Sequence, residues 1–239
     1  MALTLIVGSG RSGTHMLARA LSSHPELNVT LEIEPLFTEC VEAFRTESPQ
    51  LVPGLIKRFE SLSKRGGHQV NKTHPSMHWA KQLKSHIHDL KFVYIRRNPL
   101  SVVSSMLEHK AISKRLKTGW RNFSFPNKFL HTGNLSFEEY SALDPCERGA
   151  LCWLAAEKCY REISDWDNVH LVSYADLVLD PKKTFRGITN FLGILDEVSF
   201  PAPRKNSLEK YKSNLSIEQI RLIREIITKE LVDVKTIPK

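Results

Sequence analysis

The sequence IVGSGRSGTHML at residues 6–17 constrains the fold more than any other part of the chain. A short apolar run, Leu3–Val7, precedes it, and apolar residues at helical spacing follow it between Leu17 and Leu21. This order predicts a strand, a glycine-rich turn and a helix. In such a turn the backbone N–H groups and the positive end of the helix dipole point at one spot, which therefore binds anions.

The same loop departs from the loop that binds nucleoside triphosphates. Gly8 and Gly13 have the spacing of the pattern G-x-x-x-x-G-K-[ST], but Thr14 replaces its lysine and His15 replaces its magnesium-binding hydroxyl. An arginine, Arg11, lies inside the loop instead. Without the lysine and the magnesium ligand a triphosphate is poorly neutralised. We therefore expect a phosphate-like ligand that carries less charge and needs no metal.

Further strands and helices alternate along the chain. Apolar runs predict strands at His68–Asn71, Lys91–Ile95 and Val169–Ser173, and periodicity predicts helices at 36–44, 50–62, 77–87, 99–107, 144–163, 180–192 and after 216. Capping boxes mark two of the helix starts, at Asp144 with Glu147 and at Ser216 with Gln219. The alternation implies an α/β fold with helices on both faces of a parallel sheet. The last helix has an apolar stripe formed by Ile217, Ile220, Ile223, Ile226 and Ile227.

The length of 239 residues fits one large α/β domain, and we expect a single domain over residues 1–239. Residues 112–143 carry no clear period, and we interpret them as an irregular insertion that forms a lid or a wall of the substrate site. Its aromatic residues either line that site or belong to the core: Trp120, Phe123, Phe125 and Phe129.

Composition argues against several classes of protein. No apolar run approaches the roughly 20 residues of a membrane span, and a first strand near Leu3 leaves no room for a signal peptide, so we expect a cytoplasmic protein without a membrane partner. The net charge of +8 suits an anionic ligand, but the basic and aromatic interleaving of a nucleic-acid groove is missing. The four cysteines show no C-x-x-C pair and are expected to be reduced thiols: Cys40, Cys146, Cys152 and Cys159.

The first loop resembles the 5′-phosphosulfate loop of sulfotransferases that use 3′-phosphoadenosine 5′-phosphosulfate (PAPS). That family's pattern is close to G-x-x-R/K-S-G-T-[TS]-x-L, and GSGRSGTHML follows it except at His15, where a second threonine is common. The resemblance implies that six residues of the loop bind the co-substrate: Gly10, Arg11, Ser12, Gly13, Thr14 and His15.

Two later segments are similar to the rest of the family's nucleotide site. VYIRRNPLSVVSSM, residues 93–106, resembles the element that binds the 3′-phosphate, and Arg97 and Ser105 match its spacing of eight residues. Arg97 follows a strand, where open parallel sheets bind ligands, although Arg96 is a rival. Residues 169–194 resemble the family's late strand, its tyrosine turn and the helix that ends in F-L-G. This resemblance implies that Tyr174 contacts the adenine or the 3′ side.

VNKTHPSMHW, residues 70–79, resembles two family elements at once. One is K-[TS]-H, whose histidine is the general base, and the other is N-K-x-P, whose lysine supports the leaving group. The resemblance implies that Lys72 and Arg11 stabilise the leaving phosphate. The general base stays open between Glu34, which precedes Pro35 as in bacterial and tyrosylprotein sulfotransferases, His74, and Glu32.

Together these resemblances imply a three-layer α/β/α structure with a central parallel sheet, the P-loop NTPase-like fold of sulfotransferases. They imply in-line transfer of a sulfuryl group from PAPS to a hydroxyl or amine of a small-molecule or glycan acceptor, with no metal and no nucleic acid. One alternative is a P-loop kinase of a small metabolite, but the first loop lacks its lysine. Another is a non-catalytic nucleotide- or anion-binding module on the same fold, but Lys72, His74 and Glu34 are all present.

Overall fold

A computed structural model describes residues 2–127, 129–194 and 207–232. Its centre is a parallel sheet of five strands in the order β2-β3-β1-β4-β5. The strands are β1 (Leu3–Val7), β2 (Leu27–Leu31), β3 (His68–Lys72), β4 (Leu90–Arg96) and β5 (Val169–Ser173). The expected α/β class is confirmed. The strand β2 is an addition to the elements that the apolar runs predicted.

β1 is the middle strand of the sheet, and all five of its residues are buried. Such a continuous apolar run is typical of a parallel strand covered on both faces. β1 pairs with β3 on one side, where Leu5 faces Asn71, and with β4 on the other, where Val7 faces Tyr94. The strands that follow β1 in the sequence are therefore added first on one side of it (β2 and β3) and then on the other (β4 and β5). In open parallel sheets, ligands bind at the carboxyl ends of the strands where the direction of addition changes, which here is beside β1.

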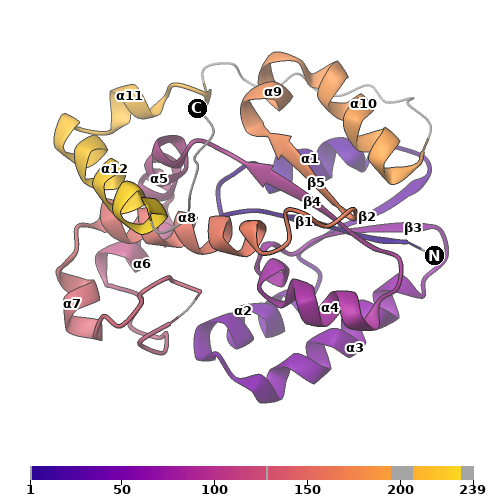
Figure 1. Cartoon of the computed structure of the whole chain (residues 1–239), viewed down its shortest axis with the longest axis horizontal. Coiled ribbons are helices and arrows are strands. Elements are labelled where there is room, and N and C mark those ends of the chain that lie inside the picture. The colour runs from indigo at the N-terminus through magenta and orange to yellow at the C-terminus, as the bar shows by residue number, and fades with distance from the viewer. Residues whose placement is uncertain (1, 128, 195–206, 233–239) are drawn as a thin grey trace.

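Helices cover both faces of the sheet (Figure 1). On one face α1, α9 and α10 enclose a core with Ile6, Val93 and Val172. On the other face α2, α3, α4 and the end of α8 enclose a core with Leu5, Phe92 and Tyr94. The bounds of the helices on these two faces are α1 (Thr14–Leu21), α2 (Leu36–Thr46), α3 (Val52–Ser63), α4 (Ala80–His86), α8 (Pro145–Arg161), α9 (Tyr174–Leu179) and α10 (Pro181–Leu192). Two 3₁₀ helices, η1 (Pro49–Leu51) and η2 (His74–Trp79), precede α3 and α4.

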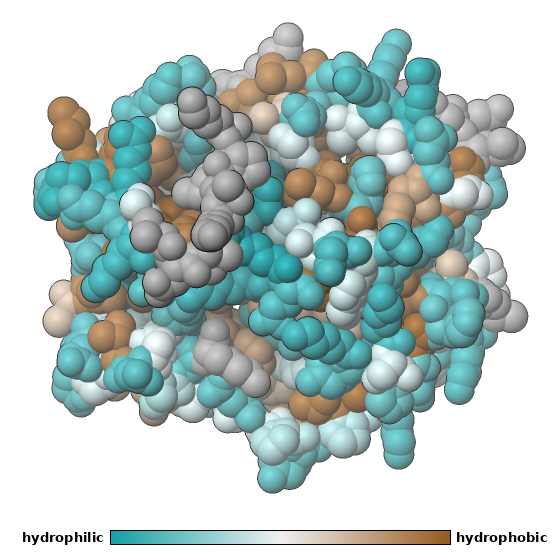
Figure 2. Space-filling view, in the orientation of Figure 1, coloured by the Kyte–Doolittle hydropathy of each residue, from teal (hydrophilic) through white to brown (hydrophobic). Residues whose placement is uncertain are grey.

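A third group of helices packs beside the sheet around α8 and has its own apolar core, which includes Val103, Leu154 and Ile223. Its other helices are α5 (Pro99–Glu108), α6 (Lys110–Lys117), α7 (Phe137–Ala142), α11 (Tyr211–Asn214) and α12 (Ile217–Val232). The segment 112–143 is thus not irregular throughout, because α6 and α7 occupy its two ends. The surface in the orientation of Figure 1 is mainly hydrophilic, with hydrophobic residues in small scattered groups (Figure 2).

The predicted helix starts are confirmed by their hydrogen bonds. Glu147 accepts from the N–H of Asp144 at 2.7 Å, and the Oγ of Ser216 accepts from the N–H of Gln219 at 3.1 Å. The predicted apolar stripe of α12 is wrong at its first position, because Ile217, which lies in the first turn of the helix, is 88% exposed. The four cysteines are free, as expected, although Cys152 and Cys159 are only partly buried.

Candidate active site

The glycine-rich loop runs from the end of β1 to the start of α1. Gly8 and Gly13 have φ angles of 148° and 107°, which residues with a Cβ rarely adopt. A Cβ on Gly8 would lie 2.6 Å from the carbonyl oxygen of Ile95, and one on Gly13 would lie 2.7 Å from the ring of Tyr174. The loop therefore packs directly against β4 and against the first residue of α9.

The loop presents polar groups that suit an anion. The side chain of Ser12 is buried, and its Oγ has no hydrogen-bond partner among the described residues. A buried hydroxyl without a partner costs free energy, which a ligand oxygen would recover. The backbone around Gly10 is open, since a Cβ there would meet nothing within 4 Å. Thr14 and His15 form the first turn of α1, the former buried and the latter exposed.

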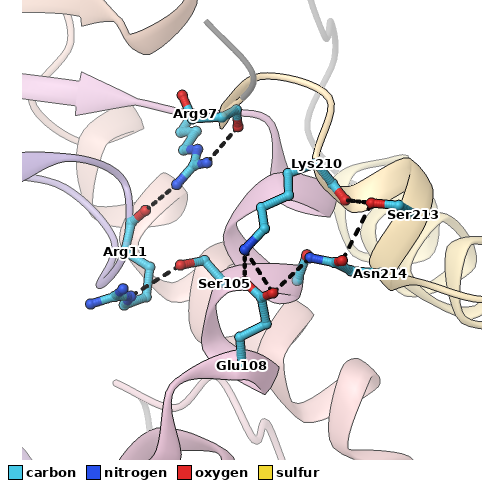
Figure 3. A network of polar contacts seen from close by, with 9 residues as sticks. Arg11, Arg97, Ser105, Glu108, Lys210, Ser213 and Asn214 are labelled. Atoms are coloured by element: carbon cyan, nitrogen blue, oxygen red, sulfur yellow. Dashed lines mark hydrogen bonds and ion pairs between the residues drawn. The ribbon is translucent and has the colours of Figure 1, made fainter. Parts of the chain in front are cut away.

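Arg97 and Ser105 converge on this loop from β4 and α5 (Figure 3). Arg97 donates to the carbonyl oxygen of Arg11 at 2.9 Å and to that of Ser207 at 2.8 Å. Its Nε is buried and has no hydrogen-bond partner among the described residues. Arg11 in turn donates from Nε to the Oγ of Ser105 at 3.2 Å. The predicted 3′-phosphate residues therefore lie beside the predicted phosphosulfate loop.

Tyr174 completes this group of residues. The guanidinium of Arg97 lies 4.4 Å from the centre of its ring, and its hydroxyl is 2.9 Å from the Oγ of Ser207. The rival Arg96 points elsewhere, because its Nε donates at 3.1 Å to the buried carboxylate of Glu157. The geometry thus brings Arg97, and not Arg96, to the loop.

Polar contacts with α5 hold the segment 207–214 in place (Figure 3). Lys210 donates to Glu108 at 2.8 Å, and Asn214 donates to the same carboxylate at 2.9 Å. The carbonyl oxygen of Leu208 accepts from the Oγ of Ser101 at 3.0 Å. The contribution of Ser207 to this site was not predicted from the sequence.

A second cluster lies at the carboxyl ends of β2 and β3 and centres on Glu32. The register of these strands pairs Leu31 with Lys72, and the N–H of Glu32 donates to the carbonyl oxygen of Lys72 at 3.0 Å. The side chain of Lys72 is 2% exposed and donates to the Glu32 carboxylate. The Nδ1 of His74 lies 3.7 Å from that carboxylate, and the Nε2 of His15 lies 3.6 Å from it.

The pKa values of Glu32, Lys72, His74 and His15 are all shifted in this cluster. Burial raises the pKa of Glu32, but hydrogen bonds from His74 and Lys72 outweigh it and hold this pKa at about 2. Burial lowers the pKa of Lys72, although Glu32 opposes this shift. Partial desolvation, together with the nearby ammonium of Lys72, also lowers the pKa values of His74 and His15 below 6.5. At neutral pH the cluster therefore holds a carboxylate, a nearly inaccessible ammonium and two neutral imidazoles.

Glu34 lies apart from this cluster. It is exposed, and its carboxylate accepts from the N–H of Thr38 at 3.2 Å, near the start of α2. It lines a cavity of about 540 Å³ between α2 and α3 together with Glu39 and Arg58. None of the loop residues Gly8–Gly13 lines that cavity.

A smaller cavity of about 190 Å³ adjoins the loop, and we call it the acceptor cavity. Gly8, Ser9 and Gly10 line it on one side, and His74 lines it as well. The sequence did not decide whether the aromatic residues of segment 112–143 line a pocket or belong to the core. Of these, Trp120, Phe123 and Phe129 line the cavity, whereas Phe125 packs against Phe137 and Tyr140.

The described residues contain neither a cluster of metal ligands nor a helix that could span a membrane. No group of three or more His, Cys, Asp or Glu residues within 2–127, 129–194 and 207–232 is placed to hold a metal ion. No helix in this part of the chain is both long enough and apolar enough to cross a membrane.

Comparison with known proteins identifies the family. A model of the sulfotransferase domain matches residues 3–231, which is nearly the whole chain. The chain belongs to the sulfotransferase family. This membership confirms the expected enzyme class, PAPS-dependent sulfuryl transfer, and the expected co-substrate. The matches give no support to the small-metabolite kinase.

Solved sulfotransferase structures are similar to this sulfotransferase over almost its full length. No curated protein matches the sequence significantly. At identities below 20% these structures show the shared fold, which confirms the three-layer sulfotransferase architecture. They include the sulfotransferase domain from the curacin biosynthetic pathway (TM-score 0.59, 15% identity, covering 95% of this chain and 97% of that chain), a sulfotransferase from Alicyclobacillus acidocaldarius (0.55, 17%, 95% and 96%) and mouse sulfotransferase SULT7A1 complexed with PAP (0.54, 18%, 97% and 85%).

Proposed function

We propose that this sulfotransferase uses Lys72 and the first loop to stabilise the leaving phosphate of PAPS, and His74 to take the proton of the acceptor. One observation carries the proposal. Lys72, Glu32 and His74 meet beside the loop, and His74 lines the same cavity as Gly8 and Gly10. His74 and the phosphate loop therefore line one space that an acceptor can enter, and the carboxylate of Glu32 links His74 to the buried ammonium of Lys72.

We assign the binding of PAPS to the two groups of residues that converge on the loop. The phosphosulfate binds the residues from Gly10 to His15, and the 3′-phosphate binds Arg97 and Ser105. Support comes from the Oγ of Ser12 and the Nε of Arg97, two buried polar atoms that have no partner within the described residues and that phosphate oxygens would satisfy. Tyr174 contacts the adenosine next to the 3′-phosphate, since its ring packs against Arg97.

The transfer step uses these groups as follows. The acceptor oxygen forms a bond to sulfur while the bond between sulfur and the 5′-phosphate oxygen breaks. The electron pair of the broken bond stays on the phosphate oxygen, where Lys72, Arg11 and the loop N–H groups stabilise the developing charge. The proton of the acceptor hydroxyl passes to His74. The product nucleotide is 3′-phosphoadenosine 5′-phosphate (PAP).

His74 fits the role of base better than either glutamate. A pKa of about 2 makes the carboxylate of Glu32 a weak base, and its contact with Lys72 occupies it further. Glu34 lines a different cavity from the loop. His74 is neutral at pH 7 because burial lowers its pKa below 6.5, so its ring has a nitrogen free to accept a proton. Glu32 orients His74 and balances the charge of Lys72.

The remaining expectations from the sequence are part of the proposal. The acceptor is a small molecule and not a nucleic acid, since the acceptor cavity of about 190 Å³ is small and lined mainly by apolar side chains. The chain acts as one domain over residues 1–239, in the cytoplasm.

Thermal unfolding with nucleotides tests the assignment of the PAPS site. A ligand at about 100 times its dissociation constant adds roughly 2.7 kcal/mol to the free energy of unfolding. PAP should therefore raise the melting temperature, whereas AMP, ADP and ATP with magnesium should have little effect. Arg97→Ala and Ser105→Ala should abolish the shift, and Arg224→Ala, which changes an exposed arginine on α12, should retain it. An equal shift with ATP and magnesium would refute the assignment.

A further inference from the structure

We infer that the acceptor is an anion: a hydroxyl on a single apolar ring, with a carboxylate that binds Arg115 at the mouth of the acceptor cavity. The inference rests on the proposed function and names the substrate class for the same site. Three observations carry it, which are the size of the cavity, the composition of its wall and the sign of the charge at its rim.

The volume of the cavity limits the acceptor to about one ring. The cavity measures about 190 Å³. A cavity of about 150 Å³ lined by apolar side chains holds benzene, so this one has room for a ring with a small substituent. Its apolar lining consists mainly of Phe37, Val41, Phe44, Met77, Met106, Ile112, Trp120, Phe123, Phe129, Leu130 and Ala156.

Four aromatic residues form a continuous wall that ends at Arg115. The rings of Phe129 and Phe44 stack with their centres 5.2 Å apart, and Phe44 meets Phe123 edge to face at 5.5 Å. Phe123 meets Trp120 at 4.8 Å, and the guanidinium of Arg115 lies 5.5 Å from the centre of the Trp120 ring. Phe129 is buried and Arg115 is exposed, so the wall leads from the interior to the surface.

The charge at the rim is positive and has no counterion in the part of the chain that the structure describes. Among the described residues that line the cavity, Arg115 is the one with a permanent charge, and none is Asp or Glu. The other titratable lining residues are His74, His78 and Cys152. Among the described residues Arg115 forms no ion pair with a carboxylate. Its guanidinium is therefore available to a ligand.

The surrounding sequence strengthens this positive field. Residues 109–137 contain no Asp or Glu, whereas Lys110, Lys114, Lys117 and Arg121 lie close to Arg115 in the chain and are exposed. The nearest acid before the segment, Glu108, is paired with Lys210. Such a field attracts anionic acceptors and repels cationic ones. A guanidinium that is held on an aromatic face binds a carboxylate with two donors.

Three phenols of similar size test the inference: 4-hydroxyphenylacetate, which is an anion, 4-ethylphenol, which is neutral, and tyramine, which is a cation. The measurement is kcat/KM with PAPS for each phenol. We expect the anion to exceed the neutral phenol at least about fivefold and the cation by more, mainly through KM. Arg115→Gln should remove this preference, because it should lower kcat/KM for 4-hydroxyphenylacetate at least about fivefold more than kcat/KM for 4-ethylphenol. The matched variant Lys117→Gln changes an exposed cation of α6 that does not line the cavity and should keep the preference.

Each outcome decides the inference separately from the proposed function. Equal rates with the three phenols, faster reaction of tyramine, or a preference that persists in Arg115→Gln would overturn it. If none of the phenols reacts and none stabilises the PAP complex against heat, the substrate class is wrong. Stabilisation by PAP in the same experiment would still support the proposed function. Failure of PAP itself to stabilise the protein would count against the proposed function instead.

Discussion

Replacement of Gly13 by alanine tests the packing that holds the first loop against the rest of the site. Gly13 has a φ of 107° and precedes the first residue of α1. An added Cβ would lie 2.7 Å and 2.8 Å from two ring atoms of Tyr174. That ring cannot move away freely, because Arg97 packs on it and Ser207 holds its hydroxyl.

The expected loss of stability follows from two contributions. A left-handed backbone costs a residue with a Cβ about 1–2 kcal/mol. Overpacking a rigid neighbour costs about 1–3 kcal/mol. Gly13→Ala should therefore lower the free energy of unfolding by about 2–5 kcal/mol, as measured by urea denaturation. The mutation should also weaken the stabilisation by PAP, because the ring of Tyr174 and the loop are displaced.

The same loop provides a matched control. Gly10→Ala adds the same methyl group where no atom lies within 4 Å, so the free energy of unfolding should change little. In a Tyr174→Ala background the steric part of the Gly13→Ala cost should disappear, which a double-mutant cycle measures. The reasoning is refuted if Gly13→Ala and Gly10→Ala unfold within about 0.5 kcal/mol of each other.

Three further predictions concern the polar groups of the site. Because the pKa of Glu32 is about 2 in the folded protein and ordinarily 4.5, its contribution to stability is present above pH 4.5 and lost as the pH falls toward 2. Glu32→Gln should therefore lower the free energy of unfolding at pH 7 by about 3 kcal/mol, since each unit of the lowered pKa is worth about 1.4 kcal/mol, and should flatten its dependence on acid pH. Equal free energies of unfolding for the variant and the wild-type protein at pH 7, measured by urea denaturation, would contradict this. Because burial lowers the pKa of His74 below 6.5, kcat/KM should rise with pH up to that region and then level, whereas a rate still rising above about pH 8 would exclude His74 as the base. Ser12→Ala removes a buried hydroxyl without a partner, so it should leave the stability of the free protein nearly unchanged and weaken PAP about tenfold by calorimetry, and an unchanged affinity would show that the hydroxyl does not bind phosphate.

The sequence predicted the structure best where a motif and the secondary structure that presents it lie within one short segment. The strand, loop and first helix at residues 3–21 are confirmed, since a buried strand and the glycines of a tight turn are local features. Arg97 lies just after the end of one strand and Ser105 on the helix that follows it, so their proximity could be predicted from their spacing in the sequence. The capping boxes of α8 and α12 depend on side chains only three residues apart, so they too could be predicted from the sequence.

Other features depend on contacts between distant segments. β2 is short, and only Leu27 of its five residues is fully buried, so it shows no apolar run. The central place of Glu32 follows from the pairing of β2 with β3, which brings it to Lys72, 40 residues later. Spacing could not separate Glu32 from Glu34, yet the fold places Glu32 against Lys72 and His74, and Glu34 at the cavity between α2 and α3. The helices α6 and α7 were missed because they are only eight and six residues long and their periodic signal is weak.

The most direct test of the account is the transfer of radioactive sulfur from ³⁵S-labelled PAPS to 4-hydroxyphenylacetate and 4-ethylphenol at pH 7. The account predicts labelled sulfate ester with the wild-type enzyme. With Lys72→Ala and His74→Ala it predicts rates lower by roughly 100- to 1000-fold. Parallel calorimetry should show that His74→Ala still binds PAP. Transfer by either variant at the wild-type rate would contradict the account, and absence of labelled product from a wild-type enzyme that binds PAP would overturn the proposed class of acceptor.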